Sequence, residues 1–178
     1  MGYIYKAGVV GAGTMGSGIA QLLTYANLPV VLKEENEEAL EKGVSRIRKT
    51  YQKRGEKGKM TPQELDLKMA LIHPTITYDA FHDVDLVIEA VPEKADLKRD
   101  VFAKLDHVCP PSSILTSNTS SLSIHDLAQA TRRPEKVAGL HFFHPVRVMK
   151  LVEVIPAEST VPDTIDTCIG LVETLRKI

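Results

Sequence analysis

The chain has 178 residues, of which 43% are hydrophobic and 25% charged, and its formal net charge at pH 7 is −1. This length and composition are typical of one globular domain with a sizeable core, and the balanced charge argues against nucleic-acid or membrane-surface binding. No apolar run approaches the roughly 20 residues needed to span a bilayer, and the N-terminus does not resemble a signal peptide. Cys109 and Cys168 fit no disulfide or metal-binding pattern, which favours a reduced, cytoplasmic protein without a metal site.

A glycine-rich turn follows the first predicted strand, residues 3–10, and opens a helix predicted over residues 14–26. Its glycines spell G-x-G-x-x-G, in which the first allows a tight turn, the second lets the backbone approach a pyrophosphate and the third lets the helix pack on the sheet. The N–H groups and the positive dipole end of the helix then face the phosphates. A purely structural turn is the alternative. The predicted dinucleotide contacts are Gly11, Ala12, Gly13, Thr14, Met15 and Gly16.

The second predicted strand, residues 29–34, ends in an acidic residue at the spacing that a dinucleotide site requires. Glu34 lies 21 residues after Gly13 (34 minus 13). A carboxylate there accepts hydrogen bonds from the adenosine ribose hydroxyls and repels a 2′-phosphate, which favours NAD over NADP. The neighbouring Lys33 weakens that preference, and a solvated glutamate is the alternative interpretation.

A highly charged stretch, residues 36–70, is predicted to form a helical hairpin. Apolar residues recur there at helical spacing on one face, namely Leu40, Val44, Ile47 and Tyr51. Gly55 and Gly58 interrupt the pattern, and a Thr N-cap followed by Pro and Glu restarts a helix at Thr61. The basic cluster of Lys53, Arg54, Lys57 and Lys59 is either a solvated face or a contact for an anionic substrate.

The remaining sequence alternates between predicted strands and helices. This alternation predicts an α/β protein with a Rossmann-type, doubly wound, mostly parallel sheet, in which the helical hairpin is inserted after the second strand. We expect residues 1–178 to form a single domain. The predicted strands are 76–78, 84–91, 113–117, 137–143 and 151–155, and the predicted helices are 94–107, 124–130 and 163–177.

A histidine near the end of the strand 137–143 is a candidate catalytic base. An antiparallel hairpin turning about Arg147 places His141 opposite Glu153, where directly paired side chains are close enough to interact. A shift of one residue in the pairing would move them to opposite faces. Histidine can take a proton from a hydroxyl as a hydride leaves the carbon, and a carboxylate orients the ring and stabilises its charged form. A purely structural histidine is the alternative.

Four stretches, residues 9–20, 85–93, 117–122 and 139–154, together resemble the L-3-hydroxyacyl-CoA dehydrogenase family of fatty-acid β-oxidation. The resemblance covers essentially the whole chain as that family's NAD-binding domain. The Leu-Lys-Glu that ends the second strand is similar to the dehydrogenase part of multifunctional β-oxidation proteins. The resemblance implies NAD-dependent oxidation of an (S)-3-hydroxyacyl-CoA to the 3-oxoacyl-CoA.

The resemblance also implies roles for individual residues. His141 is expected to be the catalytic base, Glu153 its partner, and Ser120 the residue that binds the substrate's 3-oxygen beside the nicotinamide. Further expected contacts are Glu93 and Lys98 at the nicotinamide ribose, His144 at the cofactor, and Lys57 and Thr50 at the CoA. His144 departs from the family, which usually has Asn or Ser at that position.

A second departure concerns the all-helical domain that follows the NAD-binding domain in this family. That domain supplies a catalytic asparagine, one wall of the acyl cleft and most of the dimer interface. This sequence contains no counterpart of it, so we expect a shortened protein that has little or no activity alone. Its expected partners are an acyl-CoA, the helical domain and a second copy in a homodimer. Two alternatives remain open: a non-catalytic NAD-binding module, and a dehydrogenase of a related hydroxy acid.

Overall fold

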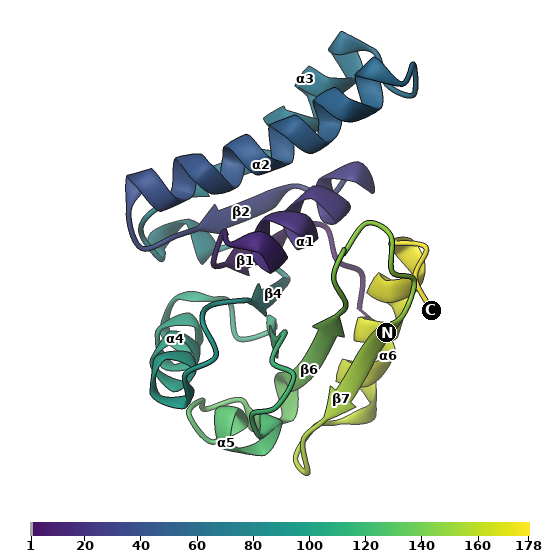
Figure 1. Ribbon diagram of the computed structural model, residues 1–178. Helices are drawn as coiled ribbons and strands as arrows, with labels where there is room; N and C mark the ends of the chain where they lie inside the picture. The colour runs from purple at the N-terminus through teal and green to yellow at the C-terminus, as the bar shows by residue number, and fades with distance from the viewer. Residues whose placement is uncertain (1) are drawn as a thin grey trace.

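A single mixed sheet organises the computed structural model, which describes residues 2–178 (Figure 1). Strands β1 to β6 are mutually parallel, and β7 pairs antiparallel with β6. The strand order is β3-β2-β1-β4-β5-β6-β7, so the direction of winding reverses between β1 and β4, where ligands of such folds bind. The strands are β1 (Ala7–Val10), β2 (Val30–Lys33), β3 (Ile72–Thr75), β4 (Leu86–Glu89), β5 (Ile114–Ser117), β6 (Val137–Phe142) and β7 (Val152–Pro156).

Helices cover both faces of the sheet. The helices are α1 (Thr14–Tyr25), α2 (Glu37–Glu56), α3 (Pro62–Ala70), α4 (Ala95–Val108), α5 (Ile124–Ala128) and α6 (Pro162–Thr174), with 3₁₀ turns at Asp79–Phe81 and Pro134–Lys136. Alternate side chains of each central strand enter opposite cores: Leu86 and Ile88 pack with α1, α2, α3 and α6, whereas Val87 packs with α4 and α5. Burial on both faces explains the apolar strand sequences. The predicted α/β fold class is confirmed.

The predicted helical hairpin is formed by α2 and α3, which lie along the β2 side of the molecule (Figure 1). Asn36 caps α2 by accepting a hydrogen bond from Ala39 N, and Thr61 forms a capping box with Glu64 at the start of α3. A methyl group on Gly43 of α2 would lie 2.7 Å from the carbonyl oxygen of Ala12. The helix therefore packs directly on the glycine-rich turn.

The third strand is not where the sequence pattern placed it. Residues 76–78 were predicted as a strand, but they lie in a bend, and β3 is formed by Ile72–Thr75. The prediction was wrong because β3 is an edge strand that begins one residue after Leu71, the C-cap of α3. An edge strand accepts Pro74 and exposed side chains, so it lacks the apolar run of a central strand. Within the described residues, no helix has both the length and the hydropathy to cross a membrane.

Candidate functional site

In the glycine-rich turn between β1 and α1, the backbone itself requires two of the three glycines, and the third leaves open space. Gly11 has φ of +98°, and a Cβ there would lie 2.6 Å from the carbonyl oxygen of Ala90. A Cβ on Gly16 would overlap the carbonyl oxygen of Gly11. A Cβ on Gly13 would meet no atom within 4 Å, so the space above this residue is open to a ligand.

The first turn of α1 offers hydrogen-bond donors to that open space. Gly13 is the N-cap and contributes no side-chain cap, so the first N–H groups of the helix are left for an anion. Beside them, the carboxylate of Glu34 accepts hydrogen bonds from Ala12 N at 2.7 Å and Glu35 N at 2.9 Å. A carboxylate has about four acceptor sites, so capacity remains for ribose hydroxyls. These groups fit the pyrophosphate and ribose of a dinucleotide.

Lys33, which weakened the preference for NAD, is engaged elsewhere. Its ammonium lies 4.3 Å from the centroid of the Tyr78 ring and donates to the carbonyl oxygen of Glu34. The side chain is buried, and burial lowers its pKa. Burial also raises the pKa of Tyr78 to about 12, so this ring remains a neutral partner for the cation. The Lys33 side chain therefore packs against Tyr78 instead of pointing toward a ribose 2′-phosphate.

The histidine pair predicted from the hairpin is present. His141 of β6 is directly opposite Glu153 of β7, as the predicted register required. The distance from His141 Nδ1 to Glu153 Oε2 is 2.8 Å, and the imidazole also contacts the Phe143 ring with centroids 4.6 Å apart. Because an ionised carboxylate only accepts hydrogen bonds, Nδ1 carries the hydrogen and Nε2 is the nitrogen left to take a proton. The arrangement can perform general base catalysis.

The loop after β5 carries Ser120 to the same edge of the sheet. Ser120 is exposed, whereas its neighbour Thr119 is buried. Asn118 Oδ1 accepts a hydrogen bond of 2.8 Å from Phe142 N, the residue after His141. This bond ties the Ser120 loop to the histidine strand. No sequence pattern predicted this bond, because a side-chain hydrogen bond between distant segments depends on the tertiary arrangement.

The loop after β4 places Glu93 next to the Ser120 loop. Glu93 Oε1 accepts hydrogen bonds from the hydroxyls of Thr119 and Ser121. Lys98, which was predicted to contact the cofactor, has a side chain that is only 1% exposed, and its Nζ lies 3.7 Å from Glu93 Oε2. Glu93 is thus available to a ligand, and Lys98 lies beside its carboxylate, so the predicted cofactor contact of Lys98 stays a prediction.

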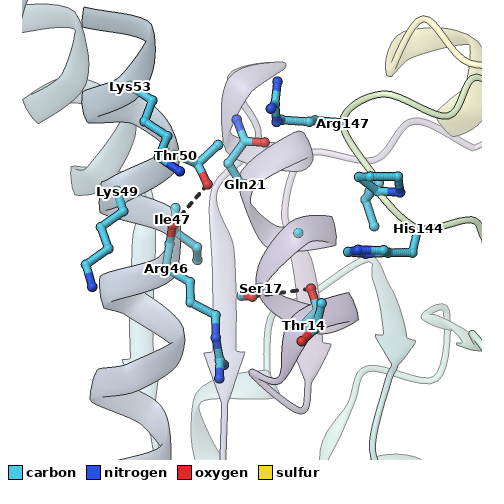
Figure 2. A pocket seen from close by; sticks show the side chains of 13 residues that line it. Thr14, Ser17, Gln21, Arg46, Ile47, Lys49, Thr50, Lys53, His144 and Arg147 are labelled. Carbon is cyan, nitrogen blue, oxygen red and sulfur yellow. Dashed lines mark hydrogen bonds between the residues drawn. The ribbon is translucent and has the colours of Figure 1, made fainter. Parts of the chain in front are cut away.

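A groove of about 330 Å³ lies between α1, α2 and the loop that joins β6 to β7 (Figure 2). Thr50 lines it, and His144 lines the opposite wall. Lys57 is the C-cap of α2 and is not among the residues that line the groove. Four cationic side chains do line it, of which only Lys53 was predicted as a contact for an anionic substrate. They are Arg46, Lys49, Lys53 and Arg147. The groove therefore suits an anionic ligand.

Arg46 connects this groove to the glycine-rich turn. Its guanidinium Nη1 donates a hydrogen bond of 3.0 Å to the carbonyl oxygen of Ala12. The same side chain lines the groove together with Thr14 and Ser17 of α1. The glycine-rich turn and the cationic groove are thus adjacent parts of one site.

Comparison with known proteins supplies the family context. Residues 6–178 match the family described as 3-hydroxyacyl-CoA dehydrogenase, NAD binding domain. The 3-hydroxybutyryl-CoA dehydrogenase of Clostridioides difficile is 41% identical over 173 residues, which are 97% of this chain and 62% of that protein. A glyoxysomal fatty acid beta-oxidation multifunctional protein of Brassica napus is 39% identical over 98% of this chain and 24% of its own length. The chain therefore spans about a quarter of such multifunctional relatives.

Solved structures with a similar fold include dehydrogenases of the same family. The chain superposes on (S)-3-hydroxybutyryl-CoA dehydrogenase from Ralstonia eutropha with a TM-score of 0.95 and 38% identity, covering 98% of this chain and 62% of that one. It superposes on FadB2 of M. tuberculosis with a TM-score of 0.96 and 38% identity, covering 99% of this chain and 63% of that one.

Proposed function

Because the chain belongs to the 3-hydroxyacyl-CoA dehydrogenase family, as its NAD-binding domain, we propose that it forms the cofactor-binding half of an active site that oxidises (S)-3-hydroxyacyl-CoA to 3-oxoacyl-CoA. The observation that carries the proposal is the hydrogen bond between His141 Nδ1 and Glu153 Oε2 at the edge of the sheet where the glycine-rich turn lies. Fatty-acid β-oxidation is the proposed context.

The residues that would hold NAD are those of the open turn and its surroundings. The amides of α1 would receive the pyrophosphate, and Glu34 the adenosine ribose. Glu93 and Ser120 would face the nicotinamide ribose and the nicotinamide, and exposed His144 would approach the cofactor from the groove. When bound, the nicotinamide accepts the hydride that leaves carbon 3 of the substrate.

The chain's own residues would manage the proton. In the oxidation direction, His141 Nε2 takes the proton of the 3-hydroxyl, and Glu153 stabilises the imidazolium that results. Ser120 would donate a hydrogen bond to the 3-oxygen, which gains carbonyl character as the C–H bond breaks. In the reverse direction, the imidazolium returns the proton to the same oxygen.

We propose that the cationic groove binds the CoA part of the substrate. CoA carries phosphate groups, and a lysine or arginine near a phosphate forms a charge-assisted hydrogen bond. Thr50 lies on the groove wall, so it would contact the pantetheine or phosphate part. Lys53 lines the groove directly, and Lys57, one helical turn further along α2, would contact the phosphates from its end.

The proposed partner is the family's helical domain, present in a longer chain or added as a separate polypeptide. An apolar patch supports this proposal, because the loop before β7 exposes Val148, Met149 and Leu151 by 56%, 40% and 49%. Neighbouring exposed apolar side chains of this kind mark an interaction surface. Without the helical domain, we expect low activity and a homodimer through the same patch, which sedimentation velocity would detect.

We also propose a cytoplasmic location. Cys109 and Cys168 are free thiols in the core, and unpaired cysteines are typical of a reducing compartment. The Brassica napus relative is named as glyoxysomal, so an organelle is the alternative. Fractionation of cells that produce the tagged chain distinguishes the two locations.

The first test is NADH oxidation by this chain with acetoacetyl-CoA as oxidant, followed at 340 nm. Turnover with the CoA ester, absent with free acetoacetate, supports the proposal. NADH binding without turnover, by fluorescence in the same sample, indicates a cofactor half that needs its helical domain. If turnover remains absent for every CoA ester after that domain is supplied, the proposal fails in favour of a related hydroxy acid or a non-catalytic module.

A further inference from the structure

Two opposite charges are buried together at the carboxyl end of β4. Glu89 is the last residue of that strand and is 0% exposed, and Lys98 in the first turns of α4 is 1% exposed. Lys98 Nζ lies 2.7 Å from Glu89 Oε1. In the sheet, Glu89 pairs with Val10 of β1 on one side and Ser117 of β5 on the other. The pair thus lies at the floor of the crevice where the strand order reverses.

Stability alone does not explain this ion pair. Removing two charges from water is costly, and replacing a buried pair by apolar residues of similar size often leaves the stability unchanged or raises it. Glu89 stands at the end of an apolar run, Leu86–Ile88, where another apolar residue would fit the pattern of the strand. The position of the pair at the ligand edge indicates another purpose.

The pair fixes the loop that leads to Glu93. Glu89 Oε1 accepts a hydrogen bond of 2.7 Å from Val91 N, and Lys98 Nζ donates one of 3.1 Å to Val91 O. Both backbone groups of Val91 are therefore held by buried charged side chains. Lys98 Nζ is also 3.7 Å from Glu93 Oε2, so it attracts the carboxylate that ends this loop.

The same pair fixes the loop that leads to Ser120. Glu89 Oε2 accepts a hydrogen bond of 2.6 Å from the Ser117 hydroxyl. The Ser117 oxygen in turn accepts one of 3.1 Å from Thr119 N, and the Thr119 hydroxyl donates to Glu93. The network is closed, since it starts at Glu89 and reaches Glu93 by two routes.

We propose that Glu89 is a positioning residue of the cofactor site, which acts with Lys98 to hold the Glu93 and Ser120 loops in the arrangement that binds NAD. This inference rests on the cofactor contacts proposed above for Glu93 and Ser120. Glu89 is 0% exposed, so it acts on a ligand through its neighbours. Its effect on NAD is exerted through Lys98, Val91, Ser117 and Thr119.

The test compares variants that keep or remove the charge balance. Glu89→Gln alone leaves the Lys98 ammonium uncompensated and is expected to unfold more easily. The double variant Glu89→Gln with Lys98→Met removes both charges and is expected to fold cooperatively. Ser117→Ala keeps the ion pair but cuts its link to the Ser120 loop. The matched control is the buried pair at the other end of α4, Asp106 and Arg133, altered by Asp106→Asn.

Two readouts separate positioning from structural support. In the chain without cofactor, amide hydrogen exchange at residues 91–93 and 117–121 is expected to be at least tenfold faster in the double variant and at least threefold faster at 117–121 in Ser117→Ala. The NADH dissociation constant is expected to rise by the same factors. In the Asp106→Asn control, the melting temperature falls while both readouts stay at wild-type values.

The proposal is overturned if the folded double variant or Ser117→Ala keeps wild-type exchange in these loops. It is equally overturned if exchange rises but NADH affinity is unchanged. If the wild-type chain itself fails to bind NADH, the cofactor assignment fails, and the exchange measurement still decides whether Glu89 orders the two loops. Should the double variant not fold, Ser117→Ala gives the same decision with the ion pair intact.

Discussion

The substitution Gly13→Ala separates cofactor binding from folding. Gly13 has φ of −68° and ψ of −163°, which an alanine adopts without strain. The added methyl would meet no protein atom within 4 Å. The structural cost is then limited to the weaker N-cap, which is about 1 kcal/mol for alanine and lowers the melting temperature by roughly 3 °C in a domain of this size. Because this methyl group would occupy the space proposed for the pyrophosphate, NADH binding is expected to weaken at least tenfold.

Two measurements check this expectation: thermal unfolding of the chain without cofactor, and fluorescence titration with NADH. Gly55→Ala in α2 is the control, because its methyl would lie at an ordinary 3.5 Å from Met60 O. It is expected to leave NADH affinity unchanged and to stabilise the helix by up to about 1 kcal/mol. Wild-type NADH affinity in Gly13→Ala would refute the placement of the pyrophosphate. A large loss of stability would refute the claim that the space is open.

Three further predictions concern the base, the groove and the core. Glu153→Gln keeps the shape of the pair but removes the charge that stabilises the imidazolium. Turnover measured with the helical domain present is therefore expected to fall roughly 100-fold, while NADH affinity stays unchanged. An unchanged rate would contradict the partnership of Glu153 with His141. Lys53→Ala is expected to weaken acetoacetyl-CoA binding by about fivefold, equivalent to about 1 kcal/mol from an exposed cation. Calorimetry measures both affinities, and the difference between variant and wild type should disappear in high salt. Asp106→Asn is expected to lower stability by about 3 kcal/mol at pH 7, because it leaves the buried Arg133 guanidinium without its carboxylate. Burial, which raises the pKa of Asp106, is outweighed by hydrogen bonds from two arginines, so the folded pKa is lowered and this stabilisation is lost as the pH falls below about 4. Urea unfolding of both proteins at pH 7 and pH 3 should therefore show a difference that shrinks in acid, and a difference independent of pH would contradict the assignment.

The sequence predicted most of the fold because its strongest signals are local. The glycine spacing, the N-caps and the apolar strands each depend on a few neighbouring residues, and the hairpin register followed from counting residues on either side of Arg147. The edge strand β3 was misplaced because Ile76–Tyr78 has the stronger β propensity, whereas pairing with β2 decides which residues form the strand.

The site was predicted less completely, for a physical reason. The roles of Asn118 and Arg46 depend on bonds to residues 24 and 34 positions away, which no periodicity encodes. Glu89 did leave a signal, a carboxylate at the end of an apolar run. Its importance follows only from the structure, in which Lys98 is its partner at 2.7 Å and both side chains are buried.

The most direct test of the central claim is NADH oxidation with acetoacetyl-CoA by the wild-type chain and by His141→Ala, each joined to the helical domain of a relative. The variant is expected to bind NADH with wild-type affinity and to have no measurable turnover, because Nε2 of His141 is the proposed proton acceptor. Undiminished turnover in His141→Ala would contradict the assignment of the His141–Glu153 pair as the base of this site.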